Sequence, residues 1–69
     1  MIGIEGKVIK YNGNTGIIID KNNNEYLILK YNIKNNENIA INDDVIFVPE
    51  LFKTIDIEEK VATFIERKK

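Results

Sequence analysis

Short runs of β-branched and aromatic residues alternate with clusters of Asn, Asp and Gly over the first half of the chain. Such runs are typical of β-strands, and the residues of the clusters adopt the positive φ angles of tight turns at little cost. The pattern predicts strands over residues 2–11, 17–19 and 25–30, joined as a meander. A meander of three such strands is expected in a small barrel or sandwich.

The next segment, residues 31–42, is polar and rich in Asn, which predicts a loop. Three isoleucines are expected to anchor this loop to the core, namely Ile33, Ile39 and Ile41. A fourth strand is predicted over residues 45–48, and Pro49 is expected to end it because proline lacks a backbone donor. Residues 50–59 are predicted to form a second loop.

The C-terminal segment fits two conformations. Asp56 and Glu59 have the spacing of a helix capping box, and the apolar residues that follow would share one helix face. However, β-branched residues occupy every second position from Val61 to Ile65, and four strands leave open edges that a fifth would close. Tertiary closure often decides the conformation of so short a segment. We therefore favour a fifth strand over residues 60–66, with a C-terminal helix as the alternative.

The composition excludes several kinds of function. With 69 residues, the chain is expected to form a single domain over residues 1–69. It contains no His and no Cys, which removes disulfides, thiolate nucleophiles, imidazole bases and the usual zinc ligand sets. We expect no catalysis, no metal and no other cofactor. Because no apolar stretch could span a bilayer and no signal peptide is recognisable, we expect a cytoplasmic protein without a membrane partner.

Charge is distributed unevenly, although the net charge is only -1. Residues 1–34 carry five lysines and three carboxylates, whereas residues 35–66 carry two lysines and eight carboxylates. A basic surface on the first three strands would attract a phosphate chain. Lysines on exposed strands also keep sheets soluble, which is the alternative explanation for the same pattern. Any nucleic-acid contact is expected on this half of the chain.

Five segments in order resemble the cold-shock domain, a five-stranded oligonucleotide-binding (OB) barrel. Residues 6–12, Gly-Lys-Val-Ile-Lys-Tyr-Asn, are similar to the opening strand G-x-V-K-W-F-N of that family. Residues 16–18 match the end of its first RNA-binding motif, K-G-F-G-F-I, and residues 25–33 run along the second, D-V-F-V-H-F-S-A-I. Residues 41–47 and 61–65 resemble the last two strands. The resemblance implies a small, all-β, five-stranded antiparallel barrel that binds single-stranded nucleic acid without catalysis.

The sequence departs from the family where the family stacks bases on exposed aromatic rings. Five of these aromatic positions hold other residues, namely Lys10, Ile17, Leu27, Leu29 and Lys30. Stacking is worth about 1–3 kcal/mol per base, so the resemblance implies weak binding of single-stranded RNA or DNA with little sequence preference. RNA is favoured over DNA. In the predicted site, Lys10 and Lys30 contact phosphates and Tyr11 packs against a base, above an apolar floor of aliphatic side chains: Ile17, Leu27 and Leu29.

The same aliphatic side chains allow a second interpretation. If Ile17, Ile19, Leu27 and Leu29 face water, they form an apolar patch of the kind that binds a protein partner or a second copy of the chain. If the register of the strands is shifted by one residue, they belong to the core instead. The OB barrel of bacterial translation initiation factor one is a third comparison, and its motifs match less well.

The aromatic residues outside the predicted site are divided between core and surface. Tyr26 and Phe47 are predicted to lie in the core. The sequence does not decide between core and surface for Phe52 and Phe64. Tyr31 replaces a small residue of the family motif and could supply a displaced stacking ring.

Overall fold

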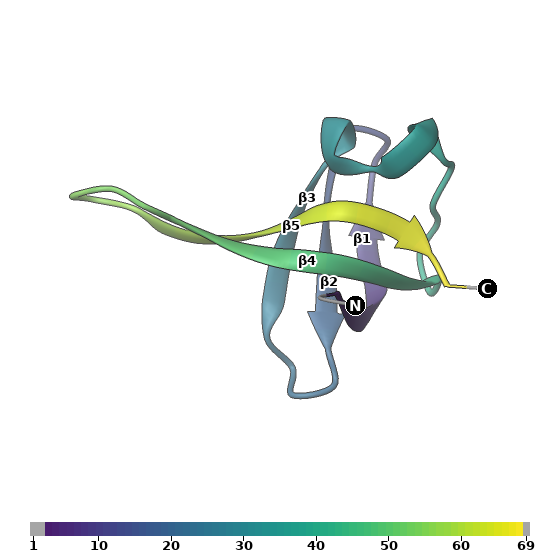
Figure 1. Ribbon diagram of the computed structural model, residues 1–69, viewed down its shortest axis with the longest axis horizontal. Coiled ribbons are helices and arrows are strands. Elements are labelled where there is room, and N and C mark those ends of the chain that lie inside the picture. Colours follow the sequence, from purple (N-terminus) through teal and green to yellow (C-terminus); the bar gives the residue numbers. More distant parts are fainter. Residues whose placement is uncertain (1–2, 69) are drawn as a thin grey trace.

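Five β-strands and two 3₁₀ turns make up the structure, a computed structural model that describes residues 3–68 (Figure 1). The strands are β1 (Ile4–Tyr11), β2 (Thr15–Asp20), β3 (Glu25–Leu29), β4 (Asp44–Lys53) and β5 (Glu58–Arg67). The turns η1 (Lys30–Asn32) and η2 (Lys34–Asn36) lie between β3 and β4. The predicted three-stranded meander is confirmed. Three residues of the predicted domain lie outside the described residues, namely residues 1, 2 and 69, and residue 2 was also predicted to begin the first strand.

The strands close into a barrel in the order β1-β2-β3-β5-β4. Neighbouring strands run antiparallel except β3 and β5, which meet in parallel at Leu27 and Val61. β1 pairs with β4 to complete the circle. The chain is therefore a small OB-fold-like barrel, as predicted. The C-terminal segment is a strand, and the alternative of a C-terminal helix is wrong because β5 supplies the pairing partner that β4 and β3 both need.

The first two turns are held by side chains that accept backbone hydrogen bonds. The Asn12 Oδ1 atom accepts from the backbone N–H groups of Asn14 and Thr15, both at 2.9 Å. Asp20 does the same in the second turn, where its Oδ1 accepts from the N–H of Asn24 at 3.0 Å. These local bonds explain why Asn and Asp end the strands where the sequence pattern predicts.

The core consists of the inward-facing residues of all five strands together with two isoleucines of the connecting loop. Phe47 is fully buried, and its ring packs against that of Tyr26 with a centroid distance of 4.9 Å and an interplanar angle of 59°. Both residues lie in the core as predicted. The buried hydroxyl of Tyr26 donates a hydrogen bond to Asp20 Oδ2 at 3.0 Å, so its burial leaves no unsatisfied polar atom.

β4 and β5 extend past the barrel as a two-stranded hairpin, which we call the arm (residues 50–60) (Figure 1). Every residue of the arm is exposed. At its tip, the N–H of Thr54 donates to the carbonyl oxygen of Ile57 at 2.7 Å. The predictions that Pro49 ends the fourth strand and that residues 50–59 form a loop are therefore wrong.

Pro49 is tolerated within β4 because of its position in the sheet. It pairs with Ala62 of β5, while among residues 3–68 the pairing of β1 with the other side of β4 stops at Ile4 and Phe47. Proline is found in strands at such edges, where a missing N–H breaks no ladder.

The loop that follows β3 is anchored by two of the three predicted isoleucines. Ile33 and Ile39 are buried, whereas Ile41 is 55% exposed. The prediction for Ile41 is wrong because this residue lies in a tight turn, in which Asp43 N donates to the carbonyl oxygen of Ala40 at 3.0 Å. No helix within residues 3–68 has the length and apolarity needed to cross a membrane.

Candidate nucleic-acid interface

The outward position of Lys10 depends on a β-bulge in β1. Val8 pairs with Ile18, and the next pair joins Lys10 to Ile17, so Ile9 is an extra residue on β1. Because side chains alternate between the two faces of a strand, this insertion exchanges the faces beyond it. Val8 before the bulge is fully buried, while Lys10 after it is exposed.

Gly16 permits the close approach of β1 and β2 beside Lys10. It pairs with Tyr11 and is buried. A Cβ atom at this position would lie 2.1 Å from the carbonyl oxygen of Lys10, well inside contact distance. A residue with a side chain would therefore push apart the two strands that position Lys10.

Lys10, Ile17 and Leu27 form one row across the outside of the barrel. Lys10 on β1 pairs with Ile17 on β2, and Ile17 pairs with Leu27 on β3. The row continues to Val61 on β5. The core side chains of β2 and β3 are Ile18, Tyr26 and Ile28, one position away from this row. The strand register therefore places four aliphatic residues outside the core cluster, namely Ile17, Ile19, Leu27 and Leu29. All four are half-buried.

A groove of about 440 Å³ lies over this row. Four of the six predicted site residues line it, namely Lys10, Tyr11, Ile17 and Leu27. Leu29 lies next to it, because it pairs with the groove residue Thr15. We call this cavity the β1–β3 groove. The exposed side chain of Ile41 also borders it. The place of Ile41 at the groove was not predicted, although the Asn-Asp-Asp cluster that follows it in the sequence favours a turn.

Lys30 lies outside the β1–β3 groove. It begins η1 and lines an adjacent cavity of about 490 Å³ together with Tyr11, Ile33 and Glu37. Tyr11 borders both cavities and joins them. The structure therefore places the two predicted phosphate-binding lysines in neighbouring cavities rather than side by side.

Tyr11 offers less ring surface than an exposed stacking residue. It is half-buried and packs against the core cluster. The apolar residues that surround it in the groove are aliphatic and have no π face. Any base in the groove would meet a half-buried Tyr11 and an aliphatic floor, so its affinity per nucleotide would be low.

Lys10 and Lys30 are exposed and are free of ion pairs within residues 3–68. The described ion pairs involve other cations: Lys7, Lys34, Arg67 and Lys68. A free ammonium can bind a phosphate without first breaking an internal pair. This distinguishes Lys10 and Lys30 from most cations of the barrel.

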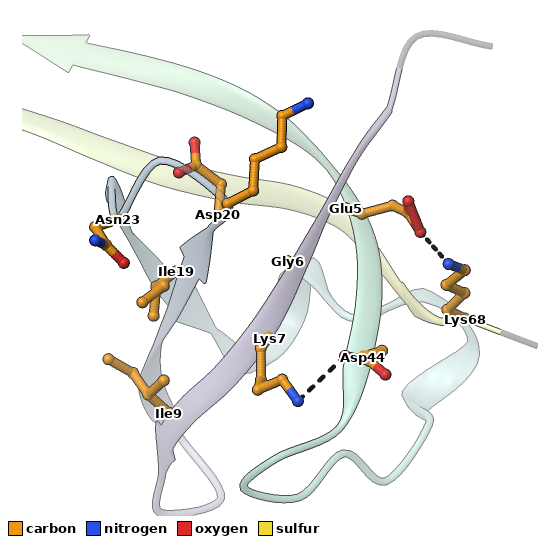
Figure 2. A pocket seen from close by; sticks show the side chains of 10 residues that line it. Glu5, Gly6, Lys7, Ile9, Ile19, Asp20, Asn23, Asp44 and Lys68 are labelled. Carbon is orange, nitrogen blue, oxygen red and sulfur yellow. Dashed lines mark ion pairs between the residues drawn. The ribbon is translucent and has the colours of Figure 1, made fainter.

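A second hollow on the outside of β1 and β2, of about 430 Å³, has a different electrostatic character (Figure 2). Figure 2 shows Lys7 paired with Asp44, at 3.6 Å, and Lys68 paired with Glu5. The hydrogen bond to Glu5 raises the pKa of the Lys68 ammonium. Lys21 also lines this hollow and belongs to none of the ion pairs within residues 3–68. The lining as a whole holds three lysines and three carboxylates, so its charge is balanced and it is a poorer phosphate site than the β1–β3 groove.

Asp20, at the edge of the same hollow, has a structural role. Desolvation raises the pKa of its carboxyl, but the hydrogen bonds that it accepts, those from Asn24 foremost, outweigh this effect and hold the pKa below its ordinary value. Desolvation and the hydrogen bond to Asp20 raise the pKa of the Tyr26 hydroxyl. The Asp20 carboxylate therefore holds the β2–β3 turn to the core.

Comparisons of the chain with protein-family models, with curated proteins and with solved structures found no match.

Proposed function

We propose that this chain is a cold-shock-like OB barrel that binds single-stranded RNA or DNA weakly and with little sequence preference. The observation that carries the proposal is the row of Lys10, Ile17 and Leu27 across three strands. It joins a cation that is free of ion pairs within residues 3–68 to an apolar floor in an open groove. OB folds bind oligonucleotides on the face of β2 and β3.

In the proposed complex, Lys10 and Lys30 bind phosphates of one strand on either side of Tyr11. The bases lie against Ile17, Leu27 and Leu29, which remove apolar base surface from water without reading base identity. Phosphate contacts and aliphatic packing are both independent of sequence. The protein thereby acts as a binding module without chemistry, and RNA is the favoured strand.

Titration of labelled single strands tests the proposal. Fluorescence anisotropy with oligouridine and with oligothymidine of equal length, repeated at several salt concentrations, gives the slope of log affinity against log salt. The expected slope is about -0.7 per neutralised phosphate. Lys10→Glu and Lys30→Glu are each expected to lower the affinity and to reduce the magnitude of the slope by about 0.7.

Lys53→Glu is the matched control, because Lys53 is exposed on the arm and lies in none of the ion pairs within residues 3–68. It makes the same change in net charge and is expected to leave the slope nearly unchanged. An equal loss in all three variants would show that binding follows net charge rather than the groove. Absence of binding by the wild-type chain at low salt would refute the proposal.

The arm favours a second candidate function, in which the chain is a protein-interaction module. Leu51, Phe52, Ile55 and Ile57 are all large apolar residues exposed on the arm. Exposed apolar surface of this kind commonly marks a protein interface. A concentration-dependent dimer in sedimentation velocity, together with no oligonucleotide binding, would favour this candidate over the first.

A further inference from the structure

Two exposed aromatic rings border a small cavity between η1 and β5. Tyr31 is 81% exposed and Phe64 is 64% exposed. Both line a cavity of about 220 Å³. A bridge between Ile33 and Ile65 fixes the segment after η1 against β5, so the two rings are held on elements that pack together. Neither residue belongs to the β1–β3 groove.

Phe64 reaches this position at the expense of backbone strain. Its φ angle is 50°, which lies in the left-handed region that bulky residues rarely adopt. The pairing of β4 with β5 shifts register here, because Ile46 pairs with Glu66 while Val48 pairs with Thr63. The resulting bulge turns Phe64 towards solvent and leaves Ile65 fully buried. Strained backbone of this kind clusters at ligand sites.

The polar groups around the cavity disfavour an anionic ligand, because the carboxylate of Glu50 also lines it. The ammonium of Lys34 lies 3.1 Å from Glu66 Oε2, so its charge is already compensated. The hydroxyl of Thr63 donates to the carbonyl oxygen of Val48 at 2.9 Å. The amide of Asn32, which also lines the cavity, offers both a donor and an acceptor for the edge of a heteroaromatic ring.

The size of the cavity points to a single ring system. Drug-sized ligands occupy clefts of about 300–1,000 Å³. A volume of about 220 Å³ is below this range. Two aromatic rings and one amide beside such a space match the stacking and edge contacts with which proteins hold an unpaired base.

The cavity also continues the path of the proposed strand. The β1–β3 groove and the cavity of Lys30 share Tyr11, and the cavity of Lys30 shares Ile33 with the cavity between Tyr31 and Phe64. Three hollows thus follow one another around the end of the barrel. A strand that leaves the groove past Lys30 arrives at Tyr31, the next residue of η1.

We propose that Tyr31 and Phe64 stack one nucleobase of the bound single strand, with the Asn32 amide at the edge of the base. This inference rests on the proposed function and adds to it two exposed aromatic rings, whereas the aromatic ring of the β1–β3 groove, that of Tyr11, is half-buried. The base site is displaced from β2 and β3 to the junction of η1 and β5.

The test uses leucine variants, which keep apolar bulk but remove the π face. Tyr31→Leu and Phe64→Leu are each expected to weaken oligonucleotide binding by about 5- to 140-fold, the range for loss of one stacked base. The salt slope is expected to stay unchanged, because no phosphate contact is removed. Phe52→Leu is the matched control, since Phe52 is 59% exposed but lies on the arm.

The outcomes separate the base site from the groove. Unchanged affinity in both Tyr31→Leu and Phe64→Leu, while Lys10→Glu still weakens binding, would overturn the base site and leave the groove in place. If the wild-type chain bound no oligonucleotide, the proposed function would be refuted. A titration with adenosine alone would then decide whether Tyr31 and Phe64 bind a base. Shifts of the Asn32 and Phe64 amide signals in NMR spectra would support a ring-binding site, and their absence would overturn it.

Discussion

The strained backbone at Phe64 predicts a reversal of the usual order of alanine and glycine stabilities. In a regular strand, glycine is less stable than alanine by about 0.5–1 kcal/mol because the unfolded chain gains freedom. At Phe64, where φ is 50°, every residue with a Cβ atom is expected to be strained and glycine is not. We therefore expect Phe64→Gly to be more stable than Phe64→Ala.

The expected difference follows from two opposing contributions. The left-handed conformation costs a residue with a Cβ atom about 1–2 kcal/mol. Glycine avoids this cost, but it also makes the unfolded chain more flexible, which lowers the free energy of unfolding by about 0.4–1 kcal/mol. The net advantage of Phe64→Gly over Phe64→Ala lies between about 0 and 1.6 kcal/mol, and its midpoint of about 0.8 kcal/mol corresponds to about 3–6 °C in melting temperature for a domain of this size. Both variants lose the same side chain, so the comparison isolates the backbone.

Thermal and urea unfolding followed by circular dichroism measure this difference. Thr63 is a suitable control position, because it precedes Phe64 on β5 and its φ is not positive. At this position, Thr63→Ala is expected to be more stable than Thr63→Gly, the ordinary order. If Phe64→Ala exceeded Phe64→Gly in stability by the same margin as Thr63→Ala exceeds Thr63→Gly, the inference that Phe64 is strained would be refuted.

Two other predictions concern the groove and its turn. Gly16→Ala should destabilise the fold by about 1–3 kcal/mol, because the added Cβ atom would lie 2.1 Å from the Lys10 carbonyl oxygen. A melting temperature equal to that of the wild type would contradict this prediction. The lowered pKa of Asp20 implies that its contribution to stability is present above the ordinary value of 3.8 and is lost as the pH falls through the folded-state pKa. The stability difference between the wild type and Asp20→Asn should therefore narrow between neutral and acidic pH, and a constant difference in urea unfolding would show that the carboxylate charge is not responsible.

The meander of the first three strands was predictable because turn chemistry acts locally. Asn12 and Asp20 end strands through hydrogen bonds to residues two to four positions away, so their effect can be anticipated without knowing the fold. Residues 26–29 are all apolar, so their pattern does not indicate which of them face inwards; the structure places Tyr26 and Ile28 in the core. The meander therefore follows from the sequence, whereas the facing of its residues is known only from the structure.

The arm was not predictable in the same way, because the effect of Pro49 depends on its neighbours in the sheet. Proline ends a strand that is paired on both sides, but it is compatible with an edge. Only the tertiary structure shows that, among residues 3–68, the pairing of β1 with β4 ends at Phe47 and leaves Pro49 on an edge. The local sequence around Pro49 would look the same in an edge strand and in a strand paired on both sides.

The candidate site was predictable only in part, since bulges move residues between faces. Lys10, Ile17 and Leu27 were expected on one surface, and the structure places them in one row. The bulge at Ile9 that makes this possible has no clear sequence signal. The second bulge exposes Phe64, a residue that the sequence could not assign to core or surface. Extra residues in strands depend on barrel closure, which is a property of the whole chain.

The way the barrel closes also has a consequence for the kinetics of folding. β1, β2 and β3 can associate through short loops, whereas β1 finds its second neighbour only when β4 arrives from far along the chain. Loop-closure entropy opposes such distant pairing, so we expect the meander to form first and the union of β1 with β4 to limit the rate. Until that step, the backbone N–H and C=O groups on the outer edge of β1 have no partners and can pair with another chain. Intermolecular aggregation during refolding should therefore begin at this edge.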